Sequence, residues 1–107
     1  MNTDRALSAL CLARKAGRLV CGTEQCLDAV RNKKACLLIV SSDVSPQTLK
    51  QITDKASFYG VAVEHTSYTR AVLGAAFGMA ECACAALCGT DFVKMYSQAK
   101  NKQSEVN

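Results

Sequence analysis

Short apolar runs alternate with longer amphipathic segments along the whole chain, and this alternation restricts its fold more than any other feature. The clearest run is Cys-Leu-Leu-Ile-Val at residues 36–40, which predicts a strand buried on both faces. The segments around it repeat apolar residues at helical spacing, as at Leu7, Leu10 and Cys11. Strands that alternate with helices over short connections predict an α/β fold, a three-layer α/β/α sandwich with a central, mostly four-stranded mixed sheet.

Local start and stop signals predict where the elements begin and end. Polar caps are expected at the starts of three helices: Asn2 or Thr3, Thr23, and Ser45 followed by Pro46. Glycines are expected to end three helices: Gly17, Gly60 and Gly78. The remaining elements are expected as strands over residues 19–21, 61–63 and 82–87 and helices over residues 68–77 and 91–100.

The length of 107 residues, half of them apolar, predicts one domain with one core. We expect that domain to cover residues 1–100 and a polar, flexible tail to cover residues 101–107. No apolar run approaches the ~18 residues that a membrane-spanning helix needs. The first residues lack the charged and apolar sections of a signal peptide, so we expect a cytoplasmic protein.

The formal net charge of +4 arises entirely between residues 14 and 34. The charged side chains of this stretch are Arg14, Lys15, Arg18, Arg31, Lys33 and Lys34 against Glu24 and Asp28. In its middle, residues 20–25 read as the end of a strand, a glycine turn and a helix start. A helix N-terminus presents unpaired N–H groups that suit phosphate. Cations around such a site favour a nucleic acid as partner, although an ordinary solvated basic face is the alternative.

Aromatic content bears on the kind of nucleic acid. The chain has no Trp, and aromatic residues make up 6% of it. This composition argues against a surface built to stack single-stranded bases, because such surfaces present aromatic rings to successive bases.

Seven cysteines and one histidine raise the question of metal or redox chemistry. The cysteines are Cys11, Cys21, Cys26, Cys36, Cys82, Cys84 and Cys88. Their spacings lack the paired C-x-x-C of zinc sites and of thioredoxin-type motifs, and His65 is isolated. Most of these cysteines occupy apolar positions, where free Cys behaves as a small hydrophobe. We therefore expect no metal, no cofactor and no disulfide.

Three groups of residues deserve comparison with catalytic sites. Glu24 and Asp28 lie one helical turn apart. They are either a pair of carboxylates for acid–base chemistry or ordinary solvated helix surface. Asp43 follows a buried strand, where α/β proteins bind ligands, or it makes a turn leading to Ser45. Cys21 next to a helix start has either a lowered pKa or a structural role. None of the three forms a catalytic constellation, so we expect a protein that is not an enzyme.

Residues 12–25, with Gly-Thr-Glu-Gln at their end, resemble the opening of the kink-turn RNA-binding ribosomal proteins, the archaeal and eukaryotic seven-Ae/thirty-e superfamily. Later segments match in order and spacing. They are residues 42–45, residues 53–55 with 59–61, and residues 73–78, which are similar to the family's Leu-Gly-x-Ala-x-Gly signature. The resemblance runs from about Leu7 to Tyr96. It is nearest to the small bacterial YlxQ-type branch, which is encoded among translation genes.

This resemblance implies a mechanism in which the start of the second helix enters the widened groove of a kinked RNA stem. By position, Gly22 and Thr23 would allow close backbone approach, and Glu24 and Gln25 would read purine edges of sheared G·A pairs. The residues that would meet phosphates are Arg14, Lys15, Arg18, Lys33 and Lys34. The loop residues that would pack on an extruded base are Met79 and Ala80.

The resemblance therefore implies a small, non-enzymatic, monomeric protein of translation. Its partner would be a structured RNA with a kink-turn, such as ribosomal RNA, on the ribosome itself, or a riboswitch. No membrane partner is implied.

The chain departs from the family at the positions that would touch RNA. The usual Asn-Glu pair is Glu24-Gln25, and Asp28 stands where kink-turn binders usually carry Lys. Met79 and Ala80 replace bulkier branched residues. These departures predict weak or altered kink-turn binding. They leave open a protein–protein adaptor on the same fold with lost or weakened RNA binding, and, as a third reading, a Cys-dependent enzyme or metal protein.

Overall fold

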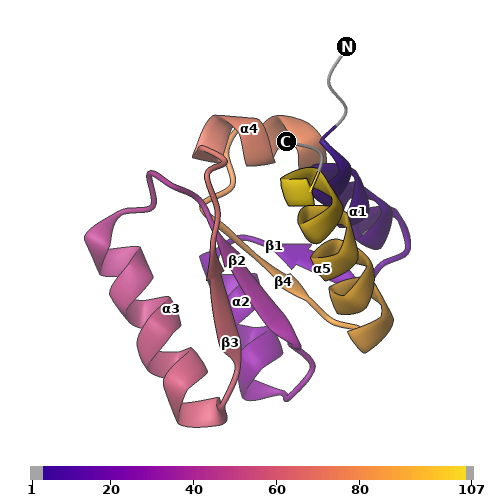
Figure 1. The fold of residues 1–107 in the computed structure, drawn as a ribbon. Coiled ribbons are helices and arrows are strands. Elements are labelled where there is room, and N and C mark those ends of the chain that lie inside the picture. Colours follow the sequence, from indigo (N-terminus) through magenta and orange to yellow (C-terminus); the bar gives the residue numbers. More distant parts are fainter. Residues whose placement is uncertain (1–3, 106–107) are drawn as a thin grey trace.

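The computed structural model describes the backbone of residues 4–105 and the side chains of residues 4–101. Within them, helices pack on both faces of a four-stranded mixed sheet (Figure 1), which confirms the expected α/β/α sandwich. The elements in chain order are α1 (Arg5–Lys15), β1 (Leu19–Cys21), α2 (Thr23–Arg31), β2 (Leu37–Val40), α3 (Pro46–Tyr59), β3 (Ala62–His65), α4 (Arg70–Phe77), β4 (Cys84–Leu87) and α5 (Thr90–Glu105).

The sheet has the strand order β1-β4-β2-β3. β4 runs antiparallel to both of its neighbours, and β2 and β3 are parallel. All four residues of β2 are buried, because Leu37 and Ile39 pack in the core beneath α1, α4 and α5 while Leu38 and Val40 pack beneath α2 and α3. The prediction of a strand buried on both faces is confirmed.

The first helix is capped by a later residue than expected. Asp4 is the N-cap, and its Oδ1 accepts a hydrogen bond from the Leu7 N–H at 3.0 Å and from the Tyr68 hydroxyl at 2.7 Å. The expected caps, Asn2 and Thr3, lie outside the described residues. The carboxylate of Asp4 thus caps α1 and also ties it to the segment before α4.

The second helix also starts differently from the prediction, whereas the third starts as predicted. Gly22 is the N-cap of α2, so the expectation that Thr23 caps this helix was wrong, and Thr23 is its first helical residue. In α3, the Ser45 hydroxyl accepts from the Thr48 N–H at 3.2 Å, and Gly60 ends the helix in the left-handed conformation. The Ser-Pro start and the glycine stop are confirmed.

Several boundaries move by a few residues. β3 begins one residue later than expected and ends two residues later, at His65, and α4 begins at Arg70 with Thr69 as its cap. β4 begins at Cys84 because the Cys82 N–H donates to the Arg70 carbonyl at 3.0 Å and so leaves the ladder. α5 continues to Glu105, five residues beyond its expected end, into the segment where a tail was expected.

Candidate nucleic-acid interface

The junction between β1 and α2 is shaped by the backbone of Gly22. This residue has φ 100° and ψ 153°, a conformation that only glycine adopts without strain. Its N–H donates to the Cys84 carbonyl at 2.9 Å, and its carbonyl accepts from the Cys26 N–H at 2.9 Å, the first bond of the helix. No side chain caps α2. The N–H groups of its first turn are therefore available to an external acceptor.

The side chains of this first turn differ in their exposure to solvent. Gly22 and Thr23 are half-buried, whereas Glu24 and Gln25 are exposed. The Thr23 hydroxyl lies 3.8 Å from the Cys84 thiol, which directs it toward the sheet. The two residues expected to read base edges thus project into solvent beside an uncapped helix end, as that reading requires.

Thiols form the floor beneath the start of α2. Cys21 and Cys82 pack on one side of the sheet, and Cys26 and Cys84 pack on the other. The hydrogen bond with Cys82 and burial raise the pKa of Cys21, and the hydrogen bond with Cys84 and burial raise that of Cys26. The environment therefore opposes ionisation of Cys21 and gives it the structural role. Among the described residues, no group of three or more His, Cys, Asp or Glu side chains is placed to hold a metal ion.

The loop before β4 approaches the same end of the sheet and is held by α4. The Met79 N–H donates to the Gly74 carbonyl at 2.8 Å, and Met79 and Ala80 are exposed. A Cβ atom at Gly74 would lie 2.7 Å from the Glu81 Cα atom and 2.8 Å from the Ala80 carbonyl oxygen. Glycine at this position is what lets the loop pack directly on α4.

Replacing Gly74 with Ala is therefore expected to lower the free energy of unfolding. Overpacking costs about 1–3 kcal/mol, and the gain in helix propensity returns only about 1 kcal/mol. Urea denaturation measures the difference, with Ala75→Ser as the control because Ala75 is exposed on the same helix. A Gly74→Ala protein as stable as the original would show that the loop does not depend on this contact.

Arg70 connects three loops at this end of the sheet. Its N–H donates to Asp43 Oδ1 at 2.8 Å, its Nε lies 3.5 Å from Asp43 Oδ2, and its Nη1 lies 3.9 Å from Glu81. The hydrogen bond from the Arg70 backbone lowers the pKa of the Asp43 carboxyl group. Asp43 thus holds the β2–α3 loop against the start of α4, which is a structural role.

The basic residues expected around one site divide between the two ends of α2. The hydrogen bond with Cys21 lowers the pKa of the Cys82 thiol, and the nearby Arg14 adds to that effect. At Cys21, the hydrogen bond with Cys82 and burial outweigh Arg14 and raise the pKa. Burial raises the pKa of Cys88 at the opposite end of β4, and Arg18 and Lys34 oppose that rise because both lie near it. The nine residues of α2 span about 14 Å, so these two groups of cations are separate.

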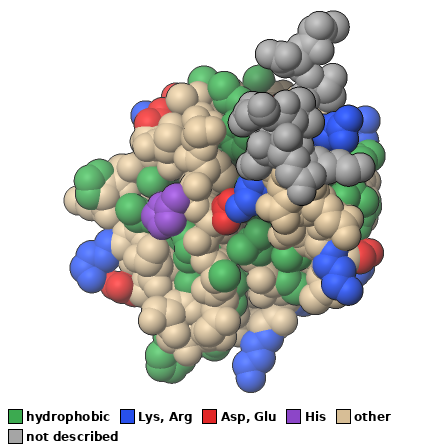
Figure 2. Space-filling model, viewed as in Figure 1, with side chains coloured by type: hydrophobic (Ala, Val, Ile, Leu, Met, Phe, Trp, Pro, Cys, Tyr) green, Lys and Arg blue, Asp and Glu red, His purple; other side chains and the backbone are tan. Residues whose placement is uncertain are grey.

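The same opposite end carries Lys33 as a further cation. Lys33 follows the C-cap of α2 in a left-handed conformation, with φ 60°. Lys15 ends α1 and is exposed. The guanidinium of Arg18 packs over Gly89, where a Cβ atom would lie 3.2 Å from Arg18 Nε. The face drawn in Figure 2 carries its Lys and Arg side chains at separated places rather than as one continuous patch.

Asp28 lies one turn into α2 and forms an ion pair with Arg31. Its Oδ1 is 3.2 Å from Arg31 Nη1, and both side chains are more than half exposed. The pair is therefore weak, worth less than about 1 kcal/mol. A carboxylate remains on the exposed surface of α2, partly offset by the adjacent guanidinium.

Sequence reasoning missed a groove between α2 and α3, where Phe58 is 80% exposed and Lys55 lies on the same wall. Helical spacing would have identified both residues as lying off the buried face of α3. The buried positions of α3 are Ile52 and Ala56. Lys55 and Phe58 are three residues apart, so they share a different face of the helix.

The chain is similar to known proteins over most of its length. The profile of the Ribosomal protein L7Ae/L30e/S12e/Gadd45 family matches residues 4–96. RNA-binding protein YlxQ of Enterococcus faecium is 38% identical over 60 residues, 56% of this chain and 58% of that protein. RNA-binding protein YlxQ of Bacillus subtilis is 36% identical over 67 residues, 63% of this chain and 66% of that protein. The matched part thus spans less than two thirds of either relative.

Solved structures agree in fold. A Bacillus halodurans protein of unknown function has a TM-score of 0.82 and 32% identity, covering 91% of this chain and 97% of its own. A Giardia lamblia 15.5kD RNA binding protein has a TM-score of 0.75 and 16% identity, covering 100% of this chain and 93% of its own. No helix in the described residues is both long and apolar enough to cross a membrane.

Proposed function

Because the chain belongs to the Ribosomal protein L7Ae/L30e/S12e/Gadd45 family, we propose that it is a non-enzymatic protein that binds structured RNA at the N-terminus of α2. The observation that carries this proposal is the uncapped start of α2 at Gly22, with Glu24 and Gln25 exposed beside it. Two relatives that are named RNA-binding protein YlxQ support RNA as the partner.

The site fits a kinked RNA stem better than a regular duplex. A-form RNA exposes base edges where its helix is interrupted, so a helix end can reach them there. Gly22 has no Cβ to hold a backbone away from the RNA, and Thr23 turns toward the protein. In this arrangement Glu24 and Gln25 meet purine edges, while Met79 and Ala80 offer an exposed surface to an extruded base. We propose that the RNA is a kink-turn of the translation apparatus and that one protein monomer binds it.

The positions of the cations suggest how phosphates are held. Arg14 lies near Cys21, which precedes the start of α2, and Arg18 and Lys34 lie near Cys88, at the other end of the β1–α2 unit. The helix α2 is about 14 Å long, and an RNA strand carries several phosphates over such a length, so one stem can reach both ends of the helix. Lys33, which follows the C-cap of α2, extends the second group, and Lys15 is a further exposed cation at the end of α1.

Replacing Arg18 with Ala tests this phosphate contact. We expect weaker RNA binding and a slope of log Kd against log salt that is shallower by up to about one unit. Filter binding at several salt concentrations measures both quantities, and Lys94→Ala on α5 is the matched control because Lys94 is also exposed. An unchanged slope would remove Arg18 from the interface.

Asp28 favours a second candidate, a protein–protein adaptor with weakened RNA binding, because its exposed carboxylate repels phosphate. The two functions predict different amounts of nucleic acid in the purified protein. An RNA-binding protein retains nucleic acid in a salt-dependent manner and has a raised 260/280 nm absorbance ratio, whereas an adaptor retains none.

A further inference from the structure

A groove of about 470 Å³ lies between α2 and α3, in the volume range of small-ligand sites. Its lining residues are Leu27, Arg31, Gln51, Asp54, Lys55, Phe58 and Tyr59. Leu27 and Arg31 belong to the second half of α2, and Phe58 and Tyr59 end α3. The groove is therefore at the opposite end of α2 from Gly22 and is separate from the site described above.

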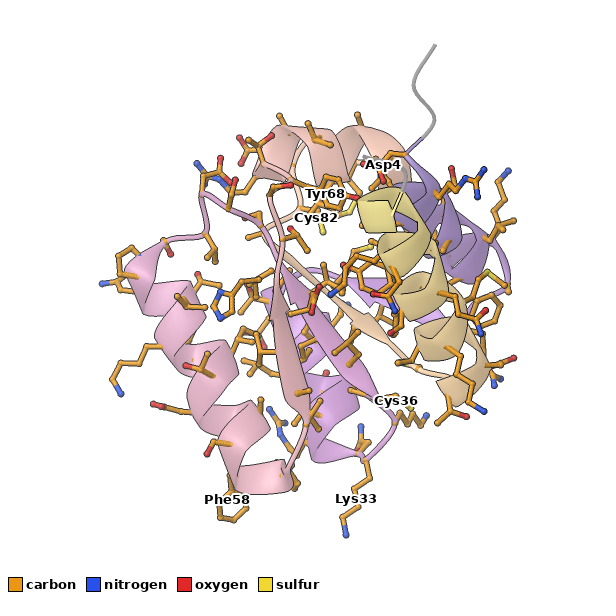
Figure 3. All side chains as sticks on the ribbon, viewed as in Figure 1. Asp4, Lys33, Cys36, Phe58, Tyr68 and Cys82 are labelled. Atoms are coloured by element: carbon orange, nitrogen blue, oxygen red, sulfur yellow. The ribbon has the colours of Figure 1, made fainter. Side chains whose placement is uncertain are left out.

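An exposed aromatic ring stands at the end of this groove. Phe58 is 80% exposed, the most exposed of the large apolar side chains in the described part of the chain. Its ring meets Tyr59 at 79° with the ring centroids 5.0 Å apart, and otherwise extends into solvent. Figure 3 labels Phe58 at the lower end of the molecule, and Figure 2 has an apolar side chain projecting at the same place. Such a ring offers a planar surface to another planar group.

Three cations lie at the same end of the molecule as this ring. Arg31 and Lys55 line the groove, and Lys33 projects from the same lower end of the molecule (Figure 3). The two acids nearby are already paired, Asp28 with Arg31 at 3.2 Å and Asp54 with Lys50 at 2.8 Å. We call Arg31, Lys33, Lys55 and Phe58 the far-end patch, in which Lys33 and Lys55 carry positive charge outside these two ion pairs.

The backbone of Lys33 is fixed by the end of α2. With φ 60°, it occupies a conformation that favours Gly or Asn after a helix. The Lys33 N–H donates to the Val30 carbonyl at 3.1 Å and the Lys34 N–H donates to the Ala29 carbonyl at 2.8 Å, the two bonds of a Schellman helix end, so the position of Lys33 at this end of the molecule is well defined.

We infer that the far-end patch binds an unpaired nucleotide of the RNA, with its base on Phe58 and its flanking phosphates on Arg31, Lys33 and Lys55. An aromatic ring combined with a basic surface is what proteins use to hold single strands. A second copy of the chain would bring like charges together, and a protein partner would need an interface core depleted of charge. The low aromatic content of the chain limits this stacking to one base rather than excluding it. The inference rests on the proposed function and adds a second contact at the other end of α2.

The test compares wild-type protein with Phe58→Ala for binding of a fluorescein-labelled uridine decamer. We expect an approximately tenfold loss of affinity in Phe58→Ala, because one stacked base is lost. Leu12→Ala is the matched control, since Leu12 is an apolar side chain, 52% exposed, on α1 in the other helical layer. Lys55→Gln is a second variant and should also weaken binding.

Equal affinity of wild-type protein and Phe58→Ala for the decamer, or no decamer binding by a wild type that binds a kink-turn RNA, would overturn the inference and favour a protein contact in the groove. Decamer binding that depends on Phe58, in a protein that does not distinguish a kink-turn from a regular stem, would support the far-end patch and contradict the kink-turn function. The two failures are thus distinguishable.

Discussion

Replacing Gly22 with Ala is expected to lower the affinity for a kink-turn RNA at least about tenfold, the largest loss we expect from one methyl group. Gly22 has φ 100° and ψ 153°, a backbone conformation that is strained in any residue with a side chain, at a cost of about 1–3 kcal/mol. No atom lies within 4 Å of the position that the new Cβ would take. The effect therefore comes from the backbone, which turns the start of α2 away from its present direction, and from the loss of close approach.

Gly17→Ala is the matched control for this substitution. Gly17 also has a positive φ, 74°, with no atom within 4 Å of an added Cβ. This variant should lose stability by about 1 kcal/mol in urea denaturation without losing affinity for RNA. Equal losses of affinity in the two variants would show that general destabilisation, rather than the start of α2, governs binding.

Replacing Asp28 with Lys is expected to tighten binding by about 1 kcal/mol, or about fivefold. The change removes a carboxylate that repels phosphate and adds a cation one turn into α2. It also releases Arg31 from its pair at 3.2 Å, so that a second cation becomes available. Electrophoretic titration against a kink-turn RNA measures the gain.

Ser8→Lys is the control for a lysine added elsewhere, because Ser8 is an exposed position on α1, in the other helical layer. It raises the net charge by one, whereas Asp28→Lys raises it by two. It should tighten binding little at physiological salt, where charges act over about 8 Å. Weaker binding by Asp28→Lys would mean that the carboxylate itself contacts the RNA, as an acceptor for a base amino group.

Local chemistry explains which parts of the fold could be predicted from the sequence. Ser45, Pro46 and Gly60 act through their own backbone and nearest neighbours, so the ends of α3 were predictable. The run at residues 37–40 is apolar on both faces, and only a buried strand satisfies it. Strand order and the meeting of loops at Arg70 depend on contacts between distant residues, for which the sequence contains no comparable signal.

The candidate site was predictable at its centre but not at its edges. The glycine turn and helix start at residues 22–25 could be recognised from local pattern, although the glycine rather than the threonine is the cap. Arg18 and Lys34 are close to this segment in sequence but lie at the other end of β1 and α2, because strand and helix each carry the chain across the molecule. The groove at Phe58 forms only when α3 packs against α2.

Electrophoretic titration of the wild-type protein against a standard kink-turn RNA tests the central claim most directly. The comparison RNA is the same stem with its sheared G·A pairs changed to Watson–Crick pairs, and both titrations are made at physiological salt. The proposed function predicts at least about tenfold tighter binding of the kink-turn, the contribution of about one good base contact. Equal binding of the two RNAs, or binding of neither, would contradict it.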